Sequence, residues 1–488
     1  MTKIKRNYYI FFILIIGFFL RLWMISLDPF LQNWDEHFHA LVAKNFSQDF
    51  LFPVLIKNPV IEYNISEWNA NHVWVHKQPF FLWQMALSIK LFGTSVFAVR
   101  LPSLIMTTIS LLIIFRLTFL LTKNYKVSFI ALILFTFSNF QLNLISGRIP
   151  TDHNDIAFGF YVLMSIWSFS EFLNSKKWYW IALTGLFSGF AVLIKWLLGI
   201  LVYSSWGLIG LFKYFKQNDK TYLFKLLFSF LICVLVFLPW QLYISKYFPI
   251  EFLYESEFNK KHFFEVLEGH GGSFIYYIKN FRHYYGYLVS FFVAYGIWEC
   301  YKQNLFKSEI GFSYIFYFTL LITFFSFFVA TKMNAFVYSI IPFGIIFASV
   351  AIFKFIESYK LKPLFVFLFL MILIFDSLKP YDIWKRTYKN NERVKKEYNT
   401  NIYKKSDAFI PANFNVIINL SDNENIDLMF YSKRNLTAYQ GVFTESQLKK
   451  LLINKVNIAA FTDHGNFILP SYIKEYPYLH IINEKLKD

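Results

Sequence analysis

Charged residues and cysteine are scarce in this chain of 488 residues. Only 16% of the residues are charged and 56% are hydrophobic, whereas soluble globular domains carry about 25% charged residues. This balance excludes an ordinary water-soluble domain and favours a membrane protein. The two cysteines, Cys233 and Cys300, fall in separate apolar segments, which excludes a disulfide framework and a thiolate metal site.

Glycine is scarce as well. The 18 glycines make up roughly 4% of the chain, against an average near 7%, and the sequence shows no internal repeat. Transporters are commonly built from repeated halves with glycine-interrupted helices, so both absences disfavour a transporter or flippase. The net charge of +17 lies mainly in short loops between apolar segments, where it indicates membrane orientation and predicts no nucleic-acid partner.

Apolar windows long enough to cross a bilayer begin at Tyr8–Leu27 and recur almost to Pro380. Basic residues mark the cytoplasmic ends of such windows. They cluster at the N-terminus and at Lys123, Lys126, Lys176, Lys177, Lys213, Lys216, Lys220, Lys302, Lys307, Lys354, Lys360 and Lys362. The sequence therefore predicts a cytoplasmic N-terminus in the plasma (inner) membrane.

The connections between these basic ends are expected outside. They comprise a first outer loop over 28–93, a short loop over 148–155, turns near Lys195 and Lys332, and a later outer loop over 243–284. Inner and outer loops alternate consistently along the chain if Pro79–Phe92, which is too short to cross, lies as a helix at the outer interface. The chain then has about eleven membrane spans. The C-terminus is then also outside.

Two domains are predicted, a transmembrane domain over 1–378 and an extracytoplasmic domain over 379–488. In the second, apolar runs at Asn415–Leu420 and Asn457–Phe461 alternate with a helical pattern at Glu445–Leu452. The predicted fold class is an all-α polytopic membrane protein with outer juxtamembrane helices and a small C-terminal α/β domain that lacks a glycine-rich phosphate loop.

Polar side chains that could carry chemistry gather in the outer loops. Asp35 and Glu36 follow the first span directly, within a run that also contains His37 and His39. Ionisable residues at a membrane edge are functional by default, although the two histidines are more readily explained as structural or solvated. Further basic and acidic candidates are Lys77, before the interfacial helix, and Arg148, Asp152 and Asp155 in the second outer loop.

These residues resemble a known family, the C-type membrane glycosyltransferases related to protein O-mannosyltransferases and lipid A aminoarabinose transferases. The resemblance covers 21–342 and rests on an ordered series of features on the outer side. They are Asp35-Glu36, Lys77-Gln78-Pro79, Gly93 with Arg100-Leu101-Pro102, an acid in the second outer loop, His270 before Tyr276-Tyr277, and Lys332 before Tyr338 and Pro342.

The resemblance implies a GT-C fold and an inverting glycosyltransferase that takes its sugar from a polyprenyl-phosphate carrier. Asp35, beside Glu36, would be the general base that deprotonates the acceptor hydroxyl, because the reaction needs a positioned carboxylate. The second-loop acid would support the site; Asp155 fits the family pattern best and Asp152 is the alternative. The donor phosphate would contact Lys77, Arg148, Lys332 and Tyr338.

The sequence departs from the aminoarabinose transferases at three positions. His76 stands where those enzymes have a metal-binding acid, Gln78 replaces one proline of a pair, and Phe38 replaces a basic residue. Imidazole can bind a divalent metal ion, so His76 with His270 would still allow a metal site, but metal dependence is open.

The acceptor is also open, since a lipid, a glycan or a protein could each approach from outside. A ligase or polymerase of lipid-linked glycans is an alternative, because such an enzyme would also act on the outer side and use a lipid phosphate. A transporter would gather its charges near the bilayer midplane, whereas here they gather at one face. If the protein were a purely structural membrane protein, Asp35 should tolerate replacement by asparagine.

Overall fold

The computed structural model describes residues 3–67, 71–421 and 423–487, without the side chains of residues 3–5. The chain forms two compact units. The first unit comprises Met1–Ser26, Lys77–Phe81 and Ser103–Arg386, and the second comprises Leu27–His76, Leu82–Pro102 and Thr387–Asp488.

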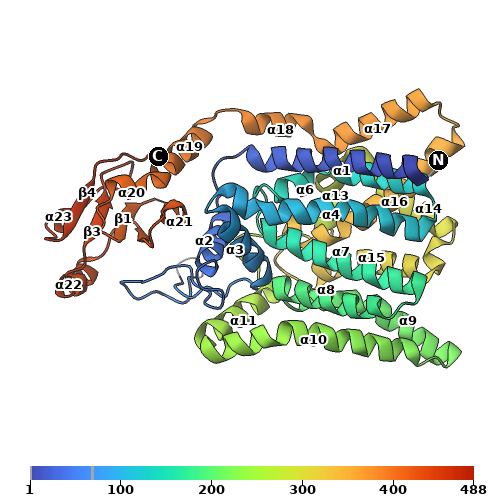
Figure 1. Cartoon of the computed structure of the whole chain (residues 1–488), viewed down its shortest axis with the longest axis horizontal. Coiled ribbons are helices and arrows are strands. Elements are labelled where there is room, and N and C mark those ends of the chain that lie inside the picture. Colours follow the sequence, from blue (N-terminus) through green and yellow to red (C-terminus); the bar gives the residue numbers. More distant parts are fainter. Residues whose placement is uncertain (1–2, 68–70, 422, 488) are drawn as a thin grey trace. The chain divides into compact units, whose positions relative to one another are not determined.

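Helices are the regular elements of the first unit's described residues, and the long ones run roughly along one another (Figure 1). Its elements are α1 (Lys3–Ser26), α4 (Val96–Thr122, shared with the second unit), α5 (Tyr125–Thr136), α6 (Asn139–Leu144), α7 (Asp152–Ser175), α8 (Tyr179–Lys195), η1 (Trp196–Leu201), α9 (Val202–Gln217), α10 (Thr221–Tyr247), α11 (Pro249–Phe264), α12 (Tyr276–Lys279), α13 (Phe281–Tyr285), α14 (Tyr287–Lys302), η2 (Leu305–Lys307), α15 (Glu309–Phe327), η3 (Asn334–Ile340), α16 (Ile341–Ser358), α17 (Pro363–Leu378) and α18 (Pro380–Thr387).

Among the described residues, eight helical stretches are long and apolar enough to cross a membrane, and α17 with α18, bent by 46°, could form a ninth. The sequence predicted about eleven spans for two reasons. It counted α14, whose 16 residues are slightly short for a membrane crossing, and it counted the 39 residues of Tyr179–Gln217 as two crossings. The predicted class, a polytopic helical membrane protein, is confirmed.

The stretch Tyr179–Gln217 reverses at η1. A Cβ atom added to Gly199 would lie 2.5 Å from the backbone nitrogen of Val192. Val192 and Gly199 are seven positions apart, and in a continuous helix they would be separated by about 10 Å along the axis. Because they are in close contact, the chain must fold back here. The reversal places Lys195 at the turn, where the sequence predicted one.

Glycine allows α8 to pack closely against α10. A Cβ atom added to Gly185 would lie 2.2 Å from the carbonyl oxygen of Ser229, and one added to Gly189 would lie 2.6 Å from Cβ of Val236. Membrane helices that approach this closely need small residues at the contact, because lipid provides no hydrophobic drive for association. These two glycines therefore fix the position of α8, the helix that ends at Lys195.

The second unit contains the first outer loop and a parallel sheet. Its elements are α2 (Asp35–Phe46), most of α3 (Phe80–Phe92), α19 (Asn391–Lys404), α20 (Ser406–Phe409), β1 (Val416–Leu420), α21 (Glu424–Tyr431), β2 (Thr437–Gln440), α22 (Glu445–Ile453), β3 (Ile458–Phe461), α23 (Ser471–Lys474) and β4 (Leu479–Ile482). The 13 residues of α3 are too short to cross a bilayer, as the sequence predicted.

The four strands pair in parallel in the order β2-β1-β3-β4. On one face of the sheet, Val416 and Ile418 of β1 pack with Leu448 and Leu451 of α22. All five residues of β1 and all four of β3 are buried, as expected for a parallel sheet covered on both faces. The predicted alternation of strand, helix and strand is confirmed, while β2, β4 and the helices around them extend it.

Candidate active site

The adjacent acids Asp35 and Glu36 open α2 in the second unit, after a sharp turn in which Trp34 has φ +73°. Glu36 is fully buried and pairs with Arg100, which is also fully buried. The two side chains form a bidentate contact, with Arg100 Nε 2.6 Å from Glu36 Oε1 and Nη2 2.8 Å from Oε2. A carboxylate held in this way is committed to an ion pair and is poorly placed to accept a proton.

Asp35 differs from its neighbour in exposure. Its side chain keeps 14% of its surface accessible, and Nε2 of His39 lies 4.0 Å from its Oδ1. Asp35 lies in the first turn of α2, where the helix dipole favours a negative charge. Of the two acids, Asp35 is therefore the one whose carboxylate can receive a proton from an incoming molecule.

A third acid in this unit, Asp28, was not predicted as part of the site. Arg100 donates hydrogen bonds to the backbone oxygens of Asp28 (2.8 Å) and Phe30 (3.0 Å). The Asp28 carboxylate accepts from Arg393 Nη1 at 2.7 Å. Asp28, Glu36, Arg100 and Arg393 thus form a buried network that fixes the start of the first outer loop.

In the first unit, the second-loop acids lie at the start of α7. The backbone is strained there, with φ +71° at Thr151 and +25° at Asp152. Asp155 is buried and its Oδ1 lies 2.5 Å from Nζ of Lys195. Thr151 also donates to Asp155, and Lys77 acts on it electrostatically. Asp155 thus contacts Lys195 directly, and the Asp152 carboxylate accepts from the backbone nitrogen of His153.

Lys195 is the main residue of this cluster that the sequence reasoning did not select. It ends α8 and is followed by Trp196 with φ +51°. Its ammonium lies 4.3 Å from the ring centroid of Phe336, a cation–π contact, and 16% of the side chain is exposed. A lysine inside an apolar run is a functional candidate by default. That signal was present in the sequence, where Lys195 was assigned only to a turn.

Two residues that were predicted to contact the donor phosphate, Lys332 and Tyr338, form hydrogen bonds within the protein. Lys332 is buried and its Nζ donates to the backbone oxygens of Phe325 (2.8 Å), Ser326 (3.1 Å) and Val329 (2.6 Å) at the end of α15. Burial lowers the pKa of Lys332. These contacts stabilise the helix end, so the predicted phosphate role now competes with a structural one.

Tyr338 belongs to a buried chain of polar side chains. Gln141 Nε2 donates to its hydroxyl at 2.7 Å, and Arg21 Nη2 donates to Gln141 Oε1 at 2.5 Å. Arg21 is fully buried and also bonds the Gly17 carbonyl. The phosphate role of Tyr338 stays a prediction.

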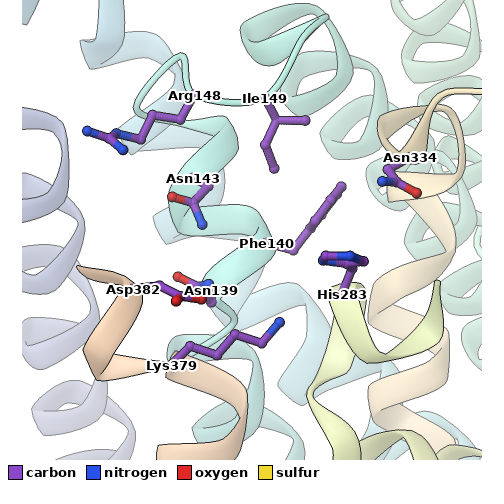
Figure 2. A pocket seen from close by; sticks show the side chains of 9 residues that line it. All are labelled: Asn139, Phe140, Asn143, Arg148, Ile149, His283, Asn334, Lys379 and Asp382. Carbon is purple, nitrogen blue, oxygen red and sulfur yellow. The ribbon is translucent and has the colours of Figure 1, made fainter. Parts of the chain in front are cut away.

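Arg148, the remaining predicted phosphate contact, is exposed and lines a polar pocket in the first unit (Figure 2). None of the other residues that line this pocket was predicted as a site residue.

The predicted metal ligands fall in different units. His76, in the second unit, packs against the ring of Trp74, while the His270 carbonyl, in the first unit, accepts from the Lys332 backbone nitrogen. Among the described residues, no group of three or more His, Cys, Asp or Glu side chains could hold a metal ion. A metal site at His76 and His270 stays a prediction.

Residues 76–242 match the family model described as dolichyl-phosphate-mannose-protein mannosyltransferase. This segment includes Lys77, Asp155 and Lys195. No match was found among curated proteins.

Two solved structures share the fold of nearly the whole chain. ArnT from Cupriavidus metallidurans, bound to undecaprenyl phosphate, is 12% identical with a TM-score of 0.67, and the match covers 91% of this chain and 88% of ArnT. The oligosaccharyltransferase AglB from Archaeoglobus fulgidus, in complex with an inhibitory peptide and a dolichol-phosphate, is 13% identical with a TM-score of 0.60, and the match covers 90% of this chain and 65% of AglB. The predicted resemblance is confirmed for the fold: the chain has the GT-C fold that ArnT and AglB share, and residues 76–242 match the mannosyltransferase family model.

Proposed function

We propose that this protein is an inverting glycosyltransferase that moves a sugar from a polyprenyl-phosphate carrier to a lipid, glycan or protein acceptor at the outer face of the membrane. The observation that carries the proposal is the cluster of Asp155, Lys195 and Lys77, which lies inside the family-matched segment. These two lysines bring positive charge to the start of a membrane helix, α7.

The ammonium groups of these two lysines suit the leaving group of the reaction. When the bond between the sugar C1 and the phosphate oxygen breaks, its electron pair stays with the lipid phosphate, which gains negative charge. Lys77 and Lys195 would stabilise that charge, because preorganised cations act strongly in a water-poor site. Asp155 would act as a positioning residue that holds the Lys195 ammonium in place through their 2.5 Å contact.

Asp35 is the proposed general base. The acceptor hydroxyl oxygen attacks the sugar C1, the hydroxyl proton passes to the Asp35 carboxylate, and the sugar inverts its configuration because a single displacement occurs. The exposure of Asp35 and the commitment of Glu36 to Arg100 support this choice between the two acids.

A lipid-linked glycan ligase or polymerase is the second candidate, since AglB shares the fold. The match covers 88% of ArnT and 65% of AglB. The sidedness, with a cytoplasmic N-terminus and an outer active site, follows from the loop charges and is part of the proposal.

The test measures sugar transfer from a radiolabelled polyprenyl-phosphate monosaccharide pool in membranes that contain equal amounts of wild type or variants. Asp35→Asn and Lys195→Met should each abolish most of the transfer. The matched controls are Asp49→Asn and Lys216→Met, which change exposed residues of the same types and should transfer like wild type. Full transfer by Asp35→Asn would remove Asp35 from the mechanism, and no transfer by wild type would contradict the donor class.

A further inference from the structure

Three lysines converge on one buried tyrosine at the end of the first unit where α1 begins. Tyr222 lies in the first turn of α10 and is 5% exposed. The ammonium of Lys213, in α9, lies 3.8 Å from the centroid of the tyrosine ring, and those of Lys176 and Lys225 each lie 5.7 Å from it. Figure 1 shows that α9 ends and α10 begins at the same end of the unit as the start of α1. Packing thus gathers lysines from α9, from α10 and from the position that directly follows α7.

The charge of Lys213 is balanced within the protein. Its ammonium forms an ion pair with Glu309, the first residue of α15. The Tyr222 hydroxyl donates a hydrogen bond to the same carboxylate at 3.3 Å. Only 16% of the Lys213 side chain is exposed. This lysine is therefore a structural contact between α9 and α15.

The charges of Lys176 and Lys225 are not balanced in this way. The Lys176 ammonium donates to the Tyr222 hydroxyl at 3.0 Å, and among the described residues neither lysine forms an ion pair. Asp219 accepts hydrogen bonds from the backbone nitrogen and the hydroxyl of Thr221, and it acts on Lys225 electrostatically. The two lysines therefore bring positive charge that no direct carboxylate contact cancels.

The two ammonium groups also share a second ring. They lie 5.7 Å (Lys176) and 5.4 Å (Lys225) from the ring centroid of Phe172. Two cations held beside the same two rings repel each other, and an anion that reaches both relieves this repulsion. Such an anion has access, since Lys176 is exposed and Lys225 is half-buried.

The surface of α10 beyond Lys225 is apolar and exposed. Phe228, Leu231 and Leu235 follow Lys225 by three, six and ten positions, which places them on one side of the helix. Their side chains are 43%, 52% and 70% exposed, and α10 is long and apolar enough to cross a membrane. Ten residues of helix rise about 15 Å, which is half of a hydrocarbon core about 30 Å thick. This apolar stripe is therefore about as long as one leaflet is deep.

We propose that Lys176 and Lys225 bind the headgroup of an anionic phospholipid whose acyl chains lie along the apolar stripe of α10. Basic sites between membrane helices on the cytoplasmic side attract anionic headgroups, and the loop charges predict that this end is cytoplasmic. A soluble phosphate would use the two ammonium groups but not the stripe, so the combination favours a lipid. The inference is independent of the proposed function, because it involves none of the residues assigned to sugar transfer.

The first experiment titrates the purified full-length protein in detergent with phosphatidylglycerol and measures bound lipid by native mass spectrometry. Phosphatidylcholine with the same acyl chains is the matched lipid. Wild type should prefer phosphatidylglycerol about 25-fold, Lys176→Gln and Lys225→Gln about fivefold each, and the double variant should show no preference. Lys225→Arg keeps the charge and should retain most of the preference. The control Lys216→Gln changes an exposed lysine of α9 and should bind like wild type.

Three results would overturn the inference. Equal binding of both lipids by wild type would mean that the two lysines select no headgroup. An equal loss in Lys216→Gln would indicate diffuse attraction by the basic surface. Displacement of phosphatidylglycerol by glycerol 3-phosphate at the same concentration would indicate a site for free anions. If Lys225→Gln fails to fold, Lys176→Gln still provides the test, because Lys176 is exposed and lies outside the helix.

A second experiment locates the acyl chains. Phosphatidylglycerol with a photoactivatable diazirine in its acyl chain is cross-linked to the full-length protein, and the labelled peptides are identified by mass spectrometry. Labelling should fall on 228–235 of α10 in wild type and should drop about 25-fold in the double variant. Labelling of this segment that is equal in both proteins, or labelling confined to other helices, would contradict the proposed site. Sugar transfer plays no part in either measurement, so a failure of the proposed function would leave both results interpretable.

Discussion

Replacing Glu36 by glutamine should destabilise the protein strongly. Replacing the adjacent Asp35 by asparagine should leave the protein folded and inactive. Glu36→Gln keeps the shape of the side chain but removes its charge. The guanidinium of Arg100, which is fully buried, would then retain the carbonyls of Asp28 and Phe30 and lose the carboxylate that it contacts at 2.6 and 2.8 Å. Breaking a buried ion pair on one side costs about 3–5 kcal/mol.

This cost converts into a temperature shift. The second unit contains about 170 residues, and an unfolding entropy of about 2 cal/mol/K per residue makes 3–5 kcal/mol equivalent to a fall in Tm of roughly 8–14 °C. Asp35→Asn loses only the interaction of its carboxylate with the helix dipole, about 0.3–1 kcal/mol, or a fall of roughly 1–3 °C. Its sugar transfer should fall about 100-fold or more.

The assay is thermal unfolding of the purified full-length protein in detergent, followed by tryptophan fluorescence, together with sugar transfer in membranes. The double variant Glu36→Gln/Arg100→Gln should recover part of the lost stability, because it removes both buried charges. A Tm change below about 2 °C in Glu36→Gln, or a large fall in Asp35→Asn, would refute the division of roles between the two acids.

Three further changes test other parts of the structure. Lys195→Met should lower stability by about 3 kcal/mol and abolish transfer, since it leaves Asp155 buried without its partner; adding Asp155→Asn should restore thermal stability but not transfer. Burial lowers the pKa of His72 to about 4, against about 6.5 in the unfolded chain, so stability should be full above pH 6.5 and fall as the pH drops toward 4. His72→Phe should remove this dependence in Tm measurements across that range. Asn419→Ala should cost about 2 kcal/mol by denaturant unfolding, because Asn419 has φ +66° and donates to the Phe461 carbonyl at 2.9 Å, whereas Asn419→Gly should cost about half as much.

Hydrophobic patterning was sufficient to predict most of the architecture. Long apolar runs fix the membrane helices because backbone polar groups must be satisfied within each span. The shortness of Pro79–Phe92 correctly predicted a helix, α3, that is too short to cross. Strand and helix periods in the C-terminal region predicted β1, α22 and β3. Lys195 was placed correctly at a turn, where η1 reverses the chain.

Pairings between distant residues were beyond the sequence reasoning. Lys195 is 40 positions from Asp155, and Arg100 is 64 positions from Glu36. Neither distance follows from a helical or strand period, because both pairs are set by how the elements pack. The polar pocket that Arg148 lines (Figure 2) was missed for the same reason: its lining residues come from five separate segments, and only Arg148 carried a recognisable signal.

The two adjacent acids show why proximity in sequence misleads about function. Successive residues of an α-helix point about 100° apart, so a single helix start can direct one acid into the protein and the next toward its surface. The Glu36–Arg100 pair fixes the rotation of α2 about its axis, and that rotation leaves Asp35 partly exposed. The buried acid therefore positions the exposed one, so a change at Glu36 should reduce transfer only by disturbing α2. A Glu36 variant that stays folded at low temperature should then transfer sugar with the same pH profile as wild type.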